Sequence, residues 1–232
     1  MTRAYAILGT GAVGGYYGAA LHHAGHPVHF LLHRDFDHVR RHGLKVEARS
    51  GDLSIADPSV FADAADLPAC DVVMVCLKTT HNHLLPSLLS RAVRDGATVL
   101  MMQNGLGNER TADEAAPQAG PILGGLAFLC SNKVGPGHIR QLDYGQVRLG
   151  QYRPDGGAAG LTDPMRAVGE DLQSAGIPVA LEEDLTTARW KKLIWNIPYN
   201  GLCTLMGATT DRLMHVGSTR QLCRDLMEEA LA

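Results

Sequence analysis

The chain has 232 residues, of which 45% are hydrophobic and 19% are charged, and its formal net charge at pH 7 is −3. These values are typical of a globular protein with one large domain or two unequal ones, and the weak net charge argues against nucleic acid or a membrane surface as a partner. The five cysteines are scattered and odd in number, and no apolar run approaches about 18 residues, so we expect a cytoplasmic protein without signal peptide or membrane span.

The most informative stretch follows the first predicted strand, Ala4 to Leu8. It reads Gly9-Thr10-Gly11-Ala12-Val13-Gly14 and continues into small and apolar residues at helical spacing. A G-x-G-x-x-G turn between a strand and a helix is the pattern that binds the pyrophosphate of a dinucleotide, because the helix start offers free N–H groups. The sequence therefore predicts a cofactor site at these six residues. The alternative is a glycine-rich loop that only packs.

Further strands are predicted at Val28 to Leu32, Val72 to Leu77 and Thr98 to Met102, and a helix at about His81 to Arg94 precedes the last of them. The continuous apolar run from Val72 is typical of a strand that is covered on both faces. The alternation of strands and helices predicts an α/β fold with a Rossmann-type doubly wound sheet.

The character of the sequence changes after residue 122. Short alternating runs around the Pro136-Gly137 turn predict antiparallel strands at the sheet edge, followed by a helix at about Pro164 to Ala175 and a strand at Ile177 to Leu181. From Asp184 the chain reads as helical to its end. We therefore expect a nucleotide-binding domain over residues 1–183 and the start of an all-helical domain over residues 184–232. Because the chain stops in mid-helix, we expect this second domain to be truncated.

Three polar residues follow predicted strands, where an open parallel sheet binds its ligands. Arg34 lies 20 residues after Gly14, at the position where NAD-preferring proteins carry an acid, so it predicts a 2′-phosphate and hence NADPH. The neighbouring Asp35 is expected to point the other way. Lys78 is a second candidate anion ligand, and Asn104 a candidate polar ligand. The alternatives are a solvated cation for Arg34, an edge lysine for Lys78 and an Asx turn for Asn104.

A second polar group lies in the helical region. Lys192, Asn196 and Asn200 are spaced four residues apart and form one stripe on a helix that is otherwise apolar. Burying these groups without partners is costly, which favours a substrate cleft, whereas the alternative is an exposed polar stripe. The 11 histidines show no metal-binding spacing, so no metal site is predicted.

Together these motifs resemble the ketopantoate reductase (2-dehydropantoate 2-reductase) family. The shared segments are G-T-G-A-V-G-G at Gly9–Gly15, C-L-K at Cys76–Lys78, Q-N-G-L-G at Gln103–Gly107, P-G at Pro136-Gly137 and W-K-K-L-x-x-N-x-x-x-N at Trp190–Asn200. Such enzymes reduce 2-dehydropantoate to (R)-pantoate with NADPH, on the route to pantothenate and coenzyme A.

The resemblance implies a role for each matching residue. It implies that the glycine turn binds the pyrophosphate, that Arg34 and Lys78 meet the 2′-phosphate, and that Asn104 helps to place nicotinamide and substrate. It also implies that Lys192 donates a proton to the substrate carbonyl, while Asn196 and Asn200 contact the substrate. Lys191 and the nearby tryptophans are expected to lower the proton affinity of Lys192.

The sequence departs from the family in one respect. Family members continue for several helices and carry a substrate-binding Ser and Glu, which this chain lacks. The missing helices would leave an apolar face uncovered and favour self-association, so a homodimer is considered beside the small-molecule 2-keto acid as partner. The alternatives for function are a reductase of another 2-keto acid and an NADPH-binding sensor without turnover.

Overall fold

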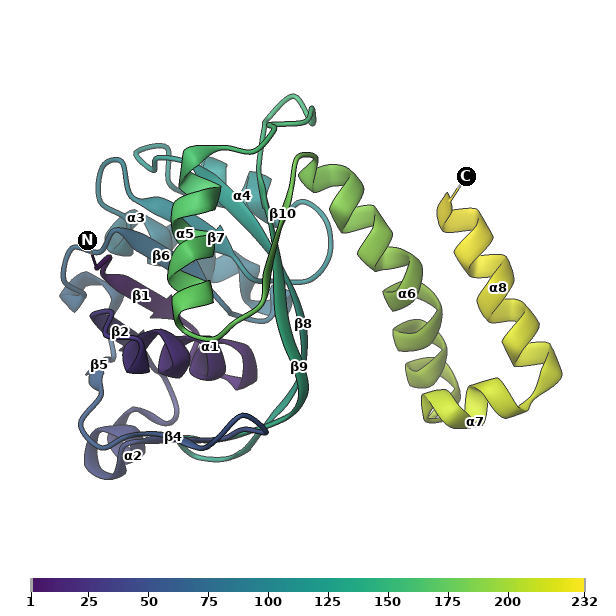
Figure 1. Ribbon diagram of the computed structural model, residues 1–232, viewed down its shortest axis with the longest axis horizontal. Helices are drawn as coiled ribbons and strands as arrows, with labels where there is room; N and C mark the ends of the chain where they lie inside the picture. The colour runs from purple at the N-terminus through teal and green to yellow at the C-terminus, as the bar shows by residue number, and fades with distance from the viewer. Residues whose placement is uncertain (1, 232) are drawn as a thin grey trace. The chain divides into compact units, whose positions relative to one another are not determined.

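The computed structural model describes residues 2–231 and divides into two compact units, Met1–Leu185 and Thr186–Ala232 (Figure 1). The first unit carries the sheet and the helices that cover it, and the second is helical.

Within residues 2–231 the strands form one ten-stranded sheet, whose centre is parallel. The central strands lie in the order β5-β2-β1-β6-β7-β8, which is the doubly wound order that reverses between the first and fourth parallel strands. Their bounds are Tyr5–Leu8 (β1), Val28–Leu31 (β2), Ser59–Phe61 (β5), Val72–Val75 (β6), Thr98–Met101 (β7) and Ile122–Gly135 (β8). The predicted Rossmann-type fold is confirmed, and the reversal point lies between β1 and β6.

Residues 122–151 form a long hairpin of β8 and β9 (His138–Gln151), which turns at Pro136-Gly137. The predicted edge position is wrong, because β9 is paired on its far side as well. Its first half pairs with β3 (Leu44–Glu47) and its second half with β10 (Val179–Glu182), while β3 also pairs with β4 (Leu53–Ile55). Register shifts interrupt the hairpin, which explains why its sequence reads as separate short strands.

One predicted helix of the first unit is shorter in the structure than expected. The segment predicted as a helix from His81 to Arg94 begins as the 3₁₀ helix η2 (Thr79–Leu84) and becomes α3 (Leu85–Ala92) only where Pro86 occupies the first helical turn. Proline has no N–H and favours the start of a helix over its interior. The other helices are α1 (Ala12–His23), α2 (Phe36–His42), the 3₁₀ helix η1 (Ala64–Asp66), α4 (Asn108–Ala115) and α5 (Asp163–Ser174).

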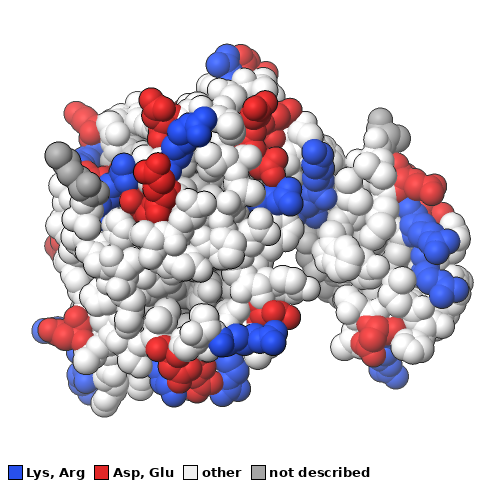
Figure 2. Space-filling view, viewed as in Figure 1, with Lys and Arg blue, Asp and Glu red and all other residues white. Residues whose placement is uncertain are grey.

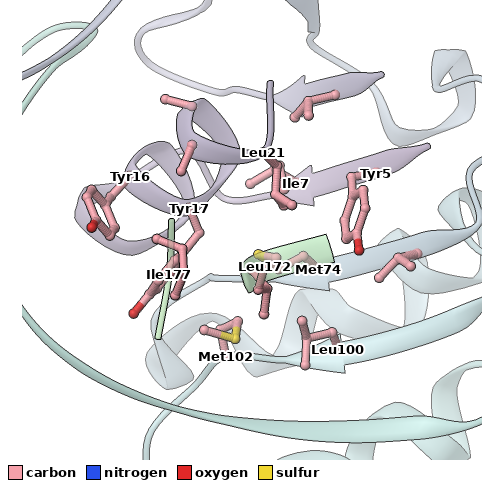
Figure 3. Close-up of a cluster of buried hydrophobic side chains, with 14 of the residues drawn as sticks. Tyr5, Ile7, Tyr16, Tyr17, Leu21, Met74, Leu100, Met102, Leu172 and Ile177 are labelled. Carbon is pink, nitrogen blue, oxygen red and sulfur yellow. The ribbon is translucent and has the colours of Figure 1, made fainter. Parts of the chain in front are cut away.

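Each face of the sheet has its own apolar core, because successive side chains of a strand point to opposite faces. Tyr5 and Ile7 of β1 face α1 and α5 in the cluster of Figure 3, whereas Ala6 and Leu8 join the core that contains Leu85 of α3. Burial on both faces accounts for the continuous apolar runs of β1 and β6.

The second unit consists of α6 (Leu185–Met206, its first residue belonging to the first unit), α7 (Thr210–His215) and α8 (Gly217–Leu231). Its small core contains Tyr199, Leu202, Leu213 and Cys223. None of the helices found between residues 2 and 231 combines the length and apolarity needed to cross a membrane.

Candidate active site

The glycine turn packs tightly against the neighbouring strand end. Gly9 has a φ of +99°, a conformation that favours glycine, and a Cβ at this position would lie 2.9 Å from Leu77 Cδ2. A Cβ on Gly14 would lie 2.3 Å from the carbonyl oxygen of Gly9 and 3.0 Å from Cβ of Cys76. Glycine at these two positions therefore lets β1, α1 and the end of β6 approach one another.

Gly11 differs from its neighbours because its surroundings are open. It is the N-cap of α1, with extended backbone angles, and a Cβ there would have no protein atom within 4 Å. The N–H groups in the first turn of α1 have no partner inside the helix, as at any helix start. An open backbone surface in front of these donors is a cradle that fits an anionic pyrophosphate.

Arg34 and Lys78 follow β2 and β6, at the same edge of the sheet as the glycine turn. Both side chains are exposed, and within residues 2–231 neither has a hydrogen-bond or ion-pair partner. The hydroxyl of Thr10 donates to the carbonyl oxygen of Leu31 at 3.2 Å, which links the glycine turn to the end of β2. The two cations therefore flank the cradle and fit a phosphorylated dinucleotide.

Asp35, the neighbour of Arg34, differs from it in being buried. Its buried carboxylate accepts a hydrogen bond from the N–H of Gly137 at 2.9 Å and pairs with Lys133 Nζ at 2.5 Å. Burial alone would raise the pKa of Asp35, but the hydrogen bonds from Lys133 and Gly137 outweigh it and lower the pKa. Asp35 is therefore an anion held by the β8–β9 hairpin.

Asn104 lies in a loop that is fixed by a polar network around it. Gln103 Nε2 donates to the carbonyl oxygen of Leu77 and to Oδ1 of Asn82, both at 2.8 Å. Asn82 Nδ2 then donates to Asn108, whose own Nδ2 donates to the carbonyl oxygen of Asn104 at 2.9 Å. The network joins the ends of β6 and β7, so Lys78 and Asn104 are held on adjacent strand ends.

Sequence reasoning missed the members of this network. Gln103 and Asn108 are buried polar side chains, and Asn82 lies in the 3₁₀ helix η2. A buried amide directly after an apolar strand is a signal that could have identified Gln103, since such a group requires partners. Asn82 has no such signal, because it lies in a polar segment whose 3₁₀ conformation was not expected.

The stripe of Lys192, Asn196 and Asn200 lies on α6 in the second unit. Lys192 and Asn196 are partly buried and Asn200 is exposed, while Trp195 is 61% exposed. Burial and the neighbouring Arg189 guanidinium lower the pKa of Lys192 to about 8. The lowered proton affinity was expected, but its charged neighbour is Arg189, which lies three residues away on the same helix side, and not Lys191.

Other reactive groups offer no competing chemistry in the part of the chain that is described. Cys76 lies beside the glycine turn, but burial raises the pKa of its thiol, so it is inert. Among residues 2–231 no three His, Cys, Asp or Glu side chains gather as metal ligands. On the face seen in Figure 2, basic and acidic side chains are intermixed.

Two family models match the chain. One, described as ketopantoate reductase PanE/ApbA, covers residues 5–154, and its C-terminal counterpart covers residues 184–232. A 2-dehydropantoate 2-reductase of Nostoc sp. is 53% identical over 230 residues, which are 99% of this chain and 72% of that protein. The match to both models and to this relative identifies the family.

Solved structures give the same result for the fold. A 2-dehydropantoate 2-reductase from Geobacter metallireducens superposes with a TM-score of 0.90 at 37% identity, covering 97% of this chain and 73% of that one. A D-mandelate dehydrogenase solved with NADH and anilino(oxo)acetate superposes with a TM-score of 0.80 at 20% identity, covering 94% and 69% of the two chains. The second likeness concerns the fold alone.

Proposed function

Because this chain belongs to the ketopantoate reductase family, whose members are nicotinamide-dependent oxidoreductases, we propose that it reduces 2-dehydropantoate to (R)-pantoate with NADPH. The observation that carries the proposal is the 53% identity, over nearly the whole chain, to a relative named for this reaction. The reaction would serve pantothenate and coenzyme A synthesis in the cytoplasm. The glycine cradle and the two exposed cations at the sheet edge supply the chemistry that the cofactor requires.

In this proposal residues 1–183 bind the cofactor and residues 184–232 begin the substrate domain. Gly9, Gly11 and Gly14 admit the pyrophosphate to the start of α1, with Thr10, Ala12 and Val13 contributing backbone to the same turn. Arg34 and Lys78 bind the 2′-phosphate. The exposure of Arg34 and Lys78 supports NADPH over NADH, and so does the engagement of the Asp35 carboxylate by Lys133 and the Gly137 N–H, since a free acid at this position would serve the ribose hydroxyls instead.

Bound NADPH supplies a hydride to the 2-keto carbon. Negative charge then grows on the carbonyl oxygen, and Lys192 stabilises that charge with its ammonium and donates the proton. A pKa of about 8 suits this role, because the amine is charged at neutral pH and yet releases its proton readily. Asn104 places the nicotinamide and the substrate, and Asn196 and Asn200 hold the substrate.

The test is to mix the purified chain with NADPH and a panel of 2-keto acids and to follow nicotinamide absorbance. Turnover fastest with 2-dehydropantoate is the expected result. Turnover on another branched 2-keto acid only would change the substrate, and NADPH binding without any turnover would indicate a sensor. Sedimentation velocity of the same sample tests the homodimer that we consider for this protein.

A further inference from the structure

The loop that carries Arg34 is held by residues about a hundred positions later in the chain. Asp35, next to Arg34, is 8% exposed, and its carboxylate is bound by Lys133 and by the N–H of Gly137 at the tip of the β8–β9 hairpin. A Cβ on Gly137 would lie 2.9 Å from Cγ2 of Val39 in α2. The hairpin tip thus packs on α2 as well as binding the acid that precedes it.

We call Asp35, Lys133 and the Gly137 N–H the Asp35 clamp. In it, the ammonium of Lys133 neutralises the negative charge of the Asp35 carboxylate. A carboxylate beside a 2′-phosphate would repel it, and a carboxylate free to turn would accept a hydrogen bond from a ribose 2′-hydroxyl or pair with Arg34. Lys133 removes the net charge, and both bonds fix the direction of the carboxylate. Arg34, by contrast, is exposed and has no ion-pair partner within residues 2–231.

We propose that Lys133 is a positioning residue for cofactor selection, which holds the Asp35 carboxylate away from Arg34 and so preserves the preference for a 2′-phosphorylated dinucleotide. This inference rests on the proposed use of NADPH. It adds that selectivity for NADPH over NADH depends on the ion pair between Asp35 and Lys133 as well as on Arg34 and Lys78. Without Lys133 the Asp35 carboxylate carries a charge that nothing neutralises. A carboxylate released from the hairpin tip would repel the 2′-phosphate and accept a ribose hydroxyl, which favours NADH.

The experiment measures binding of 2′,5′-ADP and of 5′-AMP by calorimetry, so that it requires no turnover. The variants are Lys133→Met, Asp35→Asn and the double variant, with Lys133→Arg as the conservative change. The wild-type protein is expected to prefer 2′,5′-ADP, and Lys133→Met is expected to reduce that preference about tenfold, the size of one lost charge-assisted hydrogen bond. Lys133→Arg is expected to keep the preference.

The double variant separates positioning from mere structural support. Asn at position 35 can still accept the Gly137 N–H bond but carries no charge, so adding Asp35→Asn to Lys133→Met is expected to restore the preference. Arg153→Met, which breaks the surface ion pair with Asp155 at 2.6 Å, is the matched control and leaves the preference unchanged. Thermal unfolding of each variant shows whether it is folded.

The outcomes distinguish the two levels of the proposal. If the wild-type protein does not prefer 2′,5′-ADP, the NADPH assignment and this inference both fail. If the wild-type protein prefers it but Lys133→Met retains the preference, or the double variant falls as far as Lys133→Met, only the positioning role is overturned. A reduced preference in folded Asp35→Asn alone would also overturn it.

Discussion

Gly14 packs so closely on Gly9 that a Cβ on Gly14 would lie 2.3 Å from the Gly9 carbonyl oxygen. Backbone atoms cannot yield as a flexible side chain can, so Gly14→Ala must push α1 away from β1. We expect a loss of about 1–3 kcal/mol in the free energy of unfolding, the usual cost of overpacking. A loss of stability is informative, because replacing Gly by Ala in a helix would otherwise stabilise the helix. Urea denaturation measures the loss.

Gly11→Ala is the matched control for this turn. Its Cβ would meet open space in the protein, and its backbone angles suit any residue, so the free energy of unfolding is expected to change little. NADPH affinity is expected to fall at least about tenfold, because the methyl group occupies the surface that the pyrophosphate approaches. Unchanged NADPH binding in Gly11→Ala, measured by fluorescence titration, would contradict the cradle.

The two exposed cations at the strand ends predict a selective loss of affinity. Arg34→Ala and Lys78→Ala each remove a charged donor, and we expect the Kd for NADPH to rise about tenfold or more while the Kd for NADH changes little. Arg110→Ala, an exposed arginine of α4, serves as the control. Equal losses for both dinucleotides would refute the 2′-phosphate role.

The lowered pKa of Lys192 sets the pH dependence of catalysis. The proton donor must be charged, so kcat/KM is expected to be flat below pH 8 and to fall about tenfold per unit above it. Lys192→Ala is expected to lower kcat by a factor of about 10² to 10⁴ while NADPH still binds. Lys191→Ala is the matched control on the same helix. An equal loss of kcat in that variant would contradict the role of Lys192 as proton donor.

The same lysine makes a prediction for stability that needs no substrate. Its folded pKa of about 8 lies below the ordinary value of 10.5, so between these pH values the unfolded chain binds more protons than the folded one. The contribution of Lys192 to the free energy of unfolding therefore rises with pH across this window. Thermal unfolding of Lys192→Met and wild type should show their difference shifting in favour of wild type from pH 8 to 10.5. A constant difference would show that the pKa is not lowered.

The core between α5 and the sheet gives a test of the fold itself. Leu172 is fully buried, whereas its neighbour Gln173 is exposed. Leu172→Ala is expected to cost about 2–5 kcal/mol, and Gln173→Ala less than about 0.5 kcal/mol, in the free energy of unfolding. Similar values for the two variants would show that α5 does not cover a packed core.

The parallel core was predictable because its signals are local. The run from Val72 is apolar since both faces of β6 are covered, and the glycines of the first turn identify β1 and α1 through backbone conformation alone. The short strands β3, β4 and β5 were missed because they have three or four residues with a weak apolar pattern, and their pairing comes from distant segments.

The candidate site was predictable in part for a related reason. Arg34 and Lys78 could be identified from the sequence because each follows a predicted strand. The burial of Asp35 beside the exposed Arg34 agrees with opposite orientations of neighbouring side chains. The groups that hold the Asp35 carboxylate, Lys133 and Gly137, come from another part of the chain, and the Pro136-Gly137 turn signal did not indicate that they would bind Asp35. The pKa of Lys192 was expected to fall, but its charged neighbour was misassigned, because the side chain of residue i−3 projects from the same side of a helix whereas that of residue i−1 is turned away.

Strand β9 has neighbours from opposite ends of the first unit, β3 near residue 45 and β10 near residue 180. Helix α5 also contacts the start of the chain, because the carboxylate of its Asp171 accepts a hydrogen bond from the hydroxyl of Tyr5 at 2.6 Å. During synthesis on the ribosome these contacts cannot form until about residue 182 has left the exit tunnel. Because loop closure must precede such contacts between distant segments, we expect the unit to fold slowly.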